Sequence, residues 1–202
     1  VSGMPTWGVS AAALYQGRPI AGACYIPWPT ENRHLLLHAR LGGGAWSGNK
    51  RLSVHRPTAD SIPKKGQISL VPGWFSGSKN ISHGFYGRLG ETRTTGSVVY
   101  DLCLAAYGIS QYSLTGFASV WDYAAGILLI SEAGGAVATN RSTSDRKSEL
   151  DWARFQSFAE PYENSIETYQ RLRDWHGLII GGEPNLVDFM AKNYRPTSVS
   201  LA

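Results

Sequence analysis

The segment WDYAAGILLISEAGG at 121–135 places two acidic residues at the ends of an apolar run. Asp122 opens the run, and Glu132 closes it before a pair of glycines. A carboxylate in the first turn of a helix complements the helix dipole and accepts hydrogen bonds from unpaired N–H groups. Because the small residues at 124–126 allow close approach, Asp122 is also well placed to bind a hard cation such as Mg²⁺. We therefore keep two interpretations of Asp122, a helix cap and a metal ligand, and interpret Glu132 as an ordinary residue of an exposed helix face.

The composition of the chain is that of a folded protein. It has 202 residues, 43% of them hydrophobic, which is enough to bury a substantial core. No apolar segment approaches the ~20 residues of a membrane span, so we expect a soluble, cytoplasmic protein with no membrane partner. The net charge is +4, but the basic residues are scattered, and we expect no nucleic-acid partner. The two cysteines lie in apolar stretches typical of buried residues. Val1 stands where a Met would, which indicates a chain cut from a longer one.

The first third of the chain predicts an antiparallel sheet. Apolar runs of strand length at 7–16, 18–27 and 34–41 are separated by turn-forming residues. The Gly48-Asn49 pair between two short runs is typical of a tight hairpin. The segment 55–66 carries two prolines and no periodicity, and we interpret it as a link between domains.

Beyond residue 66 the pattern changes to alternating strands and helices. We expect helices at 97–108, 120–135 and 184–194 and near 163–175, with strands at 68–72, 109–114, 135–139 and 176–182. This alternation favours an α/β fold, described more fully as an α+β layered sandwich. We expect residues 1–60 to be the remainder of an N-terminal antiparallel-sheet domain. Residues 67–202 would form a C-terminal α/β domain with a smaller mixed sheet and a polar insert at 140–175.

The segment 121–135 resembles the C-terminal signature of the inositol monophosphatase family, W-D-x-A-A-G followed by a hydrophobic run and E-A-G-G. The resemblance continues in TRTTGSVVYDLCLAAYG at 92–108, which is similar to the R-x-x-G-S/T stretch of the family and the helix after it. WGVSAAALYQGRPIAGACYIP at 7–27 resembles the paired strands of the family. GGGAWSGNKRLSV at 42–54 resembles its G-A-x-x-N-G hairpin, with the last two residues transposed. A motif of this length and order is far more specific than a short glycine pattern.

This resemblance implies Mg²⁺-dependent hydrolysis of a small phosphorylated metabolite, a phosphate monoester, by a phosphoric monoester hydrolase. Asp122 corresponds by position to the late metal-binding Asp of the family, and we expect it to be catalytic and to contact both metal and substrate. The other expected substrate contacts are Arg93, Gly96, Ser97, Val98 and Thr115. Without the resemblance, Ser97 would be interpreted as a helix cap and Arg93 as a surface residue. Self-association into a homodimer is left open.

Two departures from the family pattern limit these expectations. Thr115 stands where inositol-specific members carry a Glu that binds sugar hydroxyls, so the substrate is expected to be a different monoester, such as a histidinol, nucleotide or sugar phosphate, or a broader set. The Glu-Glu element and D-P-x-D-G-T motif of the family would lie before Val1. The chain alone is therefore expected to be inactive, with an apolar sheet face exposed where family helices lie. The alternative is a non-catalytic relative that keeps the fold for binding or assembly.

Overall fold

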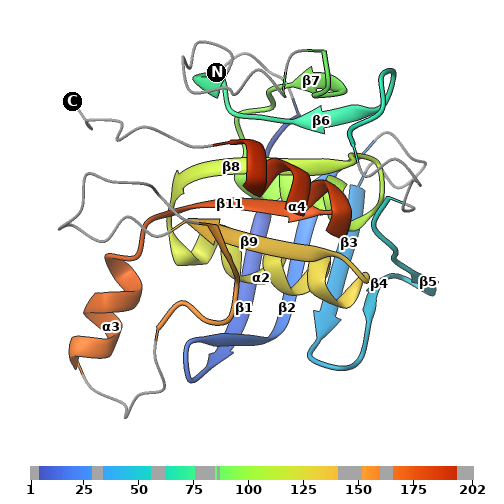
Figure 1. Cartoon of the computed structure of the whole chain (residues 1–202). Coiled ribbons are helices and arrows are strands. Elements are labelled where there is room, and N and C mark those ends of the chain that lie inside the picture. The colour runs from blue at the N-terminus through green and yellow to red at the C-terminus, as the bar shows by residue number, and fades with distance from the viewer. Residues whose placement is uncertain are drawn as a thin grey trace, which may run out of the picture.

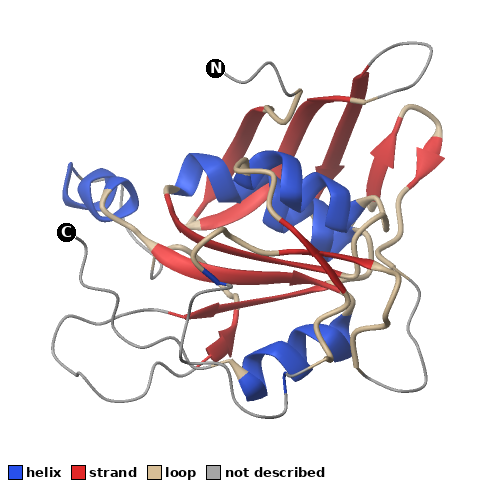
Figure 2. Ribbon diagram, turned by 90° about the horizontal axis from the view of Figure 1, so that it is seen from above, coloured by secondary structure: helices blue, strands red, loops and turns tan. Residues whose placement is uncertain are grey.

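The computed structural model describes residues 5–28, 34–55, 62–75, 85, 87–140, 152–159 and 166–194. Its elements form layers (Figures 1 and 2): an antiparallel sheet, two helices, a mixed sheet, and one helix on the outer face of that second sheet. This arrangement is the α+β layered sandwich that the sequence predicts. None of the helices in the described part of the chain is long and apolar enough to span a membrane.

Sheet A contains five antiparallel strands in the order β1-β2-β3-β4-β5. They are β1 (Val9–Tyr15), β2 (Arg18–Pro27), β3 (His34–Arg40), β4 (Ala45–Ser47) and β5 (Lys50–Arg51). The predicted meander is confirmed, as is the hairpin around Gly48, whose φ of 56° suits a glycine in the turn between β4 and β5. Alternate residues of the strands face the helices, among them Cys24, Ile26 and Leu37, which are buried.

The other face of sheet A is apolar and exposed. Val9, Tyr25 and Leu36 form a row across three strands, and Val9 and Leu36 are 60% and 51% exposed. Trp7 stacks on Tyr25 with ring centroids 5.9 Å apart and is itself 50% exposed. Within the described residues the expected exposed apolar face is therefore present.

Sheet B contains six strands in the order β10-β9-β11-β8-β6-β7. They are β6 (Ile68–Leu70), β7 (Glu91–Arg93), β8 (Tyr112–Ala118), β9 (Ala136–Asn140), β10 (Trp152–Arg154) and β11 (Gly177–Gly182). Strands β6, β7 and β8 are parallel, and the other pairs are antiparallel. The sheet is mixed, as expected. The sequence did not predict β7 and β10, because three residues are too few to show an alternating pattern.

Helices α1 (Val98–Ala106) and α2 (Val120–Glu132) fill the layer between the sheets. They approach closely at Gly126, where an added Cβ would lie 2.6 Å from Cδ1 of Leu102. Helix α4 (Pro184–Asn193) covers the outer face of sheet B, and α3 (Ile166–Arg173) lies at the side of the molecule (Figure 1). The expected insert at 140–175 contains β10 and α3, while its residues 141–151 and 160–165 lie outside the described part.

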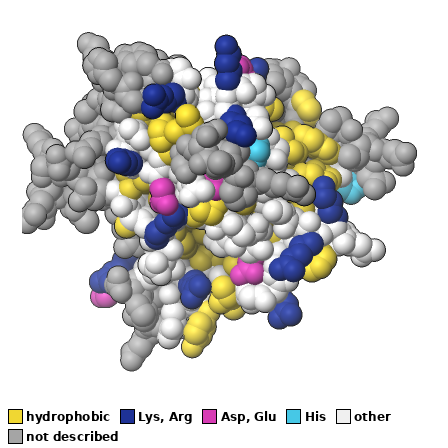
Figure 3. All heavy atoms as spheres, turned by 45° about the vertical axis from the view of Figure 1, so that its right-hand side comes forward, with side chains coloured by type: hydrophobic (Ala, Val, Ile, Leu, Met, Phe, Trp, Pro, Cys, Tyr) yellow, Lys and Arg dark blue, Asp and Glu magenta, His cyan; other side chains and the backbone are white. Residues whose placement is uncertain are grey.

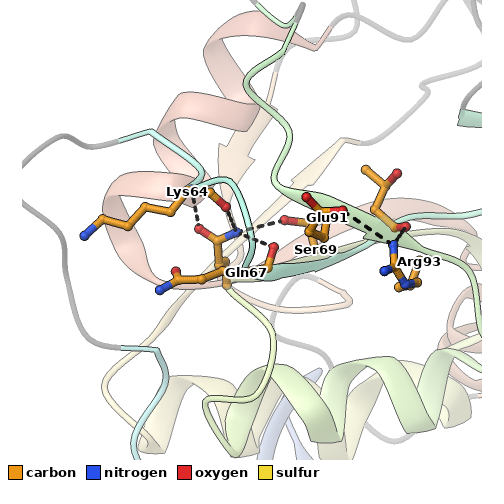
Figure 4. A network of polar contacts seen from close by, with 7 residues as sticks. Lys64, Gln67, Ser69, Glu91 and Arg93 are labelled. Carbon is orange, nitrogen blue, oxygen red and sulfur yellow. Dashed lines mark hydrogen bonds and ion pairs between the residues drawn. The ribbon is translucent and has the colours of Figure 1, made fainter.

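The buried side chain of Gln111 connects the segment before β6 to sheet B. Its amide nitrogen donates to the carbonyl oxygens of Lys64 and Gln67 at 3.1 and 2.9 Å and to Oγ of Ser69 at 3.3 Å, and its Oε1 accepts from the Lys64 N–H at 2.7 Å. Figure 4 shows Lys64, Gln67 and Ser69 around this contact. The C-terminal part of the expected interdomain link at 55–66 is therefore bonded to sheet B, while residues 56–61 lie outside the described part.

Glu132 connects the end of α2 to the hairpin between β3 and β4. Its two carboxylate oxygens accept hydrogen bonds from the backbone N–H groups of Gly42 and Gly44, both at 2.8 Å. The interpretation of Glu132 as an ordinary surface residue is wrong, because both of its carboxylate oxygens bind backbone groups of another element. The sequence could not show this, because the two partners are 88 and 90 residues away and leave no local signal.

Candidate active site

The candidate site lies where three parallel strands end. Because β6, β7 and β8 are parallel, their carboxyl ends lie at the same edge of sheet B. The segments that follow them are 71–75, 94–97 and 119–122. The first two are bonded to each other: Oγ1 of Thr94 donates to the carbonyl oxygen of Val71 at 2.8 Å, and the Val71 N–H donates to the carbonyl oxygen of Arg93 at 2.9 Å. In open sheets of this kind, ligands bind outside the carboxyl ends of the strands.

Both central helices begin on the same side of the molecule. The start of α1 lies near β1, because an added Cβ at Gly8 would be 2.6 Å from Cγ1 of Val99, and its end lies near β5, where the Lys50 ammonium is 4.1 Å from the centre of the Tyr107 ring. Helix α2 likewise begins beside β1 and ends at the Gly42–Gly44 hairpin. The two helices therefore run in the same direction, and the positive ends of their dipoles lie over the same side.

Asp122 is the third residue of α2 and caps the helix. Its Oδ2 accepts a hydrogen bond from the backbone N–H of Ser119 at 3.0 Å. The buried Tyr123 holds the start of the helix in place. Its hydroxyl donates to the carbonyl oxygen of Gly177 at 3.0 Å and accepts from the Ala118 N–H at 3.4 Å. Asp122 is only half-buried. The cap interpretation is therefore confirmed, and Asp122 retains exposed surface for a second role.

A second ordered turn precedes α1. Oγ of Ser97 accepts from the Tyr100 N–H at 3.3 Å, so Ser97 is the cap of this helix. Thr95 orders the turn: Oγ1 accepts from the Ser97 N–H at 3.2 Å and donates to Oδ1 of Asp101 at 2.5 Å. Burial raises the pKa of Asp101 to about 6, and the Thr95 hydrogen bond opposes that rise. Gly96 has a φ of 84° and open space at its Cα, so this turn can admit a ligand.

The other predicted substrate residues have different settings. Arg93 lies on β7 with an exposed side chain that donates to the Thr92 carbonyl oxygen at 2.8 Å and lies 3.9 Å from Glu91 (Figure 4). Val98 begins α1 and packs against the core. Thr115 is 3% exposed, and its hydroxyl donates to the Ile179 carbonyl oxygen at 3.5 Å. The Thr115 hydroxyl is therefore not exposed where a substrate could bind it.

Two further features lie at this side of the molecule. A groove of ≈ 290 Å³ runs beside the start of α2, between β1 and α3, and is lined by Ser10, Ala12, Leu14, Val120, Trp121, Ala124, Tyr169, Leu172 and Arg173. The aromatic pair Trp74 and Phe117 lies at the ends of β6 and β8, with ring centroids 6.0 Å apart. One weak signal of this pair is visible in the sequence, the run GWF at 73–75. On the face drawn in Figure 3, the Lys and Arg side chains are spread among apolar groups.

The donor set around Asp122 does not by itself suit Mg²⁺. This ion takes six oxygen ligands, usually including one or two carboxylates and a phosphate. Within the described ranges no group of three or more His, Cys, Asp or Glu side chains is close enough to share a metal ion. Asp122 is therefore a single carboxylate, already engaged through one of its oxygens.

Comparison with known proteins shows the family of the chain. The profile of the inositol monophosphatase family matches residues 1–173. The chain belongs to the inositol monophosphatase family. It is 34% identical over 149 residues to an inositol-1-monophosphatase of Mesorhizobium japonicum, covering 67% of this chain and 50% of that protein. It is also 34% identical over 144 residues to the Nus factor SuhB of Pasteurella multocida, covering 68% and 51%. The chain thus spans about half the length of the relatives it matches.

Solved structures of family members share the fold. The SuhB protein of Bartonella henselae matches with a TM-score of 0.59 at 23% identity, covering 92% of this chain and 63% of that one. A staphylococcal enzyme, SaIMPase-II, solved with 2'AMP bound, matches with a TM-score of 0.63 at 21% identity, covering 93% and 60%. At these identities the likeness establishes the fold, and the activity has to be argued from the site.

Proposed function

We propose that the complete protein hydrolyses a small phosphate monoester with the help of Mg²⁺. The observation that carries the proposal is the convergence of two helix starts, at Ser97 and Ser119, on the edge of sheet B where three parallel strands end. Backbone N–H groups at a helix start, together with the helix dipole, favour an anion such as phosphate. Family membership favours the same chemistry, because the relatives include proteins named inositol-1-monophosphatase.

In this proposal the residues of the chain bind and orient the substrate. The open turn at Gly96, ordered by Thr95 and Asp101, receives phosphate oxygens beside the start of α1. Asp122, fixed by its bond to the Ser119 N–H, presents its exposed oxygen to the same space. When bound, Mg²⁺ would neutralise phosphate charge and lower the pKa of a water molecule. Because the described residues supply Asp122 as a single carboxylate, the remaining ligands would have to come from elsewhere in the complete protein, and we expect the chain alone to be inactive.

The substrate is a small phosphorylated metabolite in this proposal. SaIMPase-II has been solved with inositol monophosphate and with 2'AMP, so both a cyclic polyol phosphate and a nucleotide belong in a substrate panel. A cytoplasmic location and homodimer formation are parts of the proposal that need their own measurements, by fractionation and by sedimentation.

The test is phosphate release by the complete protein from that panel, with and without Mg²⁺. We expect Asp122→Asn to abolish most of the turnover, because the substitution keeps the shape of the side chain and removes its charge. Asp188→Asn is the matched control, because Asp188 is an exposed acid on α4 whose side chain pairs with Arg154 at 2.7 Å. Equal turnover in the Asp122→Asn variant and the wild type would return Asp122 to the role of a helix cap alone.

A second candidate function is a non-catalytic binding role. It is favoured by the relatives named as Nus factors, which match this chain as well as the enzymes do. Absence of turnover across the panel by a folded complete protein, in the presence of Mg²⁺, would select this alternative.

A further inference from the structure

Phe117 has an unfavourable backbone conformation near the end of β8. Its φ is 57°, in the left-handed region, and among the described residues the only other non-glycine with positive φ is Gln16, in a hairpin turn. For a bulky side chain this conformation is an outlier that costs on the order of 1 kcal/mol or more. The ring is also 42% exposed. The fold therefore holds an apolar ring at the surface in a conformation that glycine would adopt more easily.

Gly116, the residue before Phe117, leaves room for a second aromatic ring beside it. An added Cβ at Gly116 would lie 2.9 Å from Cζ2 of Trp74, so the absence of a side chain there lets the Trp74 ring lie against β8. Trp74 is only half-buried, and it meets Phe117 at a tilt of 52°. The two rings together form an aromatic pair with exposed surface.

The aromatic pair lies at the same carboxyl edge of sheet B as the two helix starts, and Trp74 packs on the side of the sheet that α4 covers. Trp74 belongs to segment 71–75, which is bonded to Thr94, and an added Cβ at Gly73 would lie 3.9 Å from Cγ2 of Thr94. Phe117 is two residues before Ser119, whose N–H binds Asp122. A substrate whose phosphate is held at the helix starts would meet these rings where its organic group extends along that edge.

We propose that Trp74 and Phe117 form the specificity-determining platform of the site and stack against a planar ring in the substrate, as in a nucleoside monophosphate. This inference rests on the proposed phosphatase function and narrows its substrate class. An exposed aromatic surface suits a flat, apolar ring and, apart from the indole N–H of Trp74, offers no hydrogen bonds to a polyol. The side chain of Thr115 offers none, because its hydroxyl is buried and donates to Ile179. Stacking of one base on an aromatic side chain changes affinity by about five- to hundredfold.

The test compares two substrates, adenosine 2'-monophosphate and inositol 1-phosphate, in the complete protein. We expect Phe117→Gly to lower kcat/KM for the nucleotide about five- to hundredfold and to change kcat/KM for inositol phosphate less than about twofold. Phe117→Tyr should keep the nucleotide preference, because it keeps the ring. The thermal midpoint of Phe117→Gly should be unchanged or higher, since glycine relieves the strained φ. A residue retained only for packing would instead lose stability.

Three results would overturn the inference: an equal fall in kcat/KM for both substrates in Phe117→Gly, no fall for either substrate, or a preference of the wild type for inositol phosphate. If the wild type hydrolyses neither compound, the phosphatase proposal fails, and the inference is then decided by binding. In NMR spectra of protein labelled in its aromatic rings, adenosine 2'-monophosphate should shift the ring resonances of Trp74 and Phe117. Unchanged resonances at millimolar nucleotide would overturn the inference independently of any activity.

Discussion

Glu132 provides a direct test of how the two halves of the fold are connected. Its carboxylate accepts two short hydrogen bonds, from the N–H groups of Gly42 and Gly44 at 2.8 Å each. Hydrogen bonds to a charged group contribute about 1.5–3 kcal/mol each when buried. Here Gly44 is buried, but Gly42 is exposed and Glu132 itself is half-buried, so water can replace part of what is lost. We therefore expect Glu132→Ala to lower the free energy of unfolding by about 2 kcal/mol in total.

For a chain of this size, about 2 kcal/mol corresponds to a fall in Tm of roughly 4–8 °C. Glu132→Gln should lie between Ala and the wild type, because its amide oxygen can still accept one of the two bonds. The assay is thermal unfolding followed by circular dichroism, with amide exchange of Gly42 and Gly44 as the local readout. Asp188→Ala is the control, since its exposed pair with Arg154 is worth about 0–1 kcal/mol. A Tm within 1 °C (about 0.3 kcal/mol) of the wild type, with both amides still protected, would refute this account of Glu132.

Three further predictions follow from burial. Gly126→Ala should destabilise the chain by about 1–3 kcal/mol in urea unfolding, although alanine favours helix, because its Cβ would overlap Leu102; a gain in stability would contradict the close approach of α1 and α2. The pKa of Asp101 in the folded chain, about 6, exceeds its ordinary value of 3.8. The stability that comes from the protonated Asp101 is therefore fully present below about pH 4 and is lost as the pH rises through 6. Asp101→Asn should therefore remove about 3 kcal/mol of pH dependence between pH 4 and 7, and an unchanged pH–stability curve would contradict the buried charge. The exposed face of sheet A should bind a hydrophobic dye, and Val9→Lys with Leu36→Lys should reduce that binding in the isolated chain.

The strands and helices with long, regular patterns could be predicted from the sequence. The meander of sheet A, the helices beginning near Ser97 and Val120, and the expected position of Asp122 at the first turn of its helix all follow from local pattern and capping chemistry. The short strands β7 and β10 could not, because their three residues, ETR and WAR, show neither a period nor the apolar run that marks the equally short β6. Strand β8 also ends later than expected, at Ala118, because its pairing with β11 extends the strand through residues that resemble a turn.

Contacts between distant residues account for what the sequence could not show. Glu132 looks like any acid near a helix end, and its glycine partners are recognised only in the folded chain. Cys24 and Cys103 are 79 residues apart in sequence, yet their thiols meet between β2 and α1, where the hydrogen bond to Cys103 lowers the pKa of Cys24. Thr115 was expected in the site on grounds of position, whereas its register opposite Ile179 directs the hydroxyl into sheet B.

Helix α2 gives the candidate site a mechanical connection to a remote hairpin. Asp122 and Glu132 lie on the same helix, ten residues apart, which at 1.5 Å per residue is about 15 Å along the axis. A continuous helix is a rigid element that carries a displacement along its axis, because each turn is bonded to the next. The hairpin at Gly42–Gly44 therefore restrains the C-terminal end of α2, and the N-terminal end of the same helix carries the Asp122 carboxylate. We therefore expect changes in the length or composition of that hairpin to alter the position of Asp122 at the carboxyl edge of sheet B, to the extent that the bond of Tyr123 to Gly177 at the helix start allows.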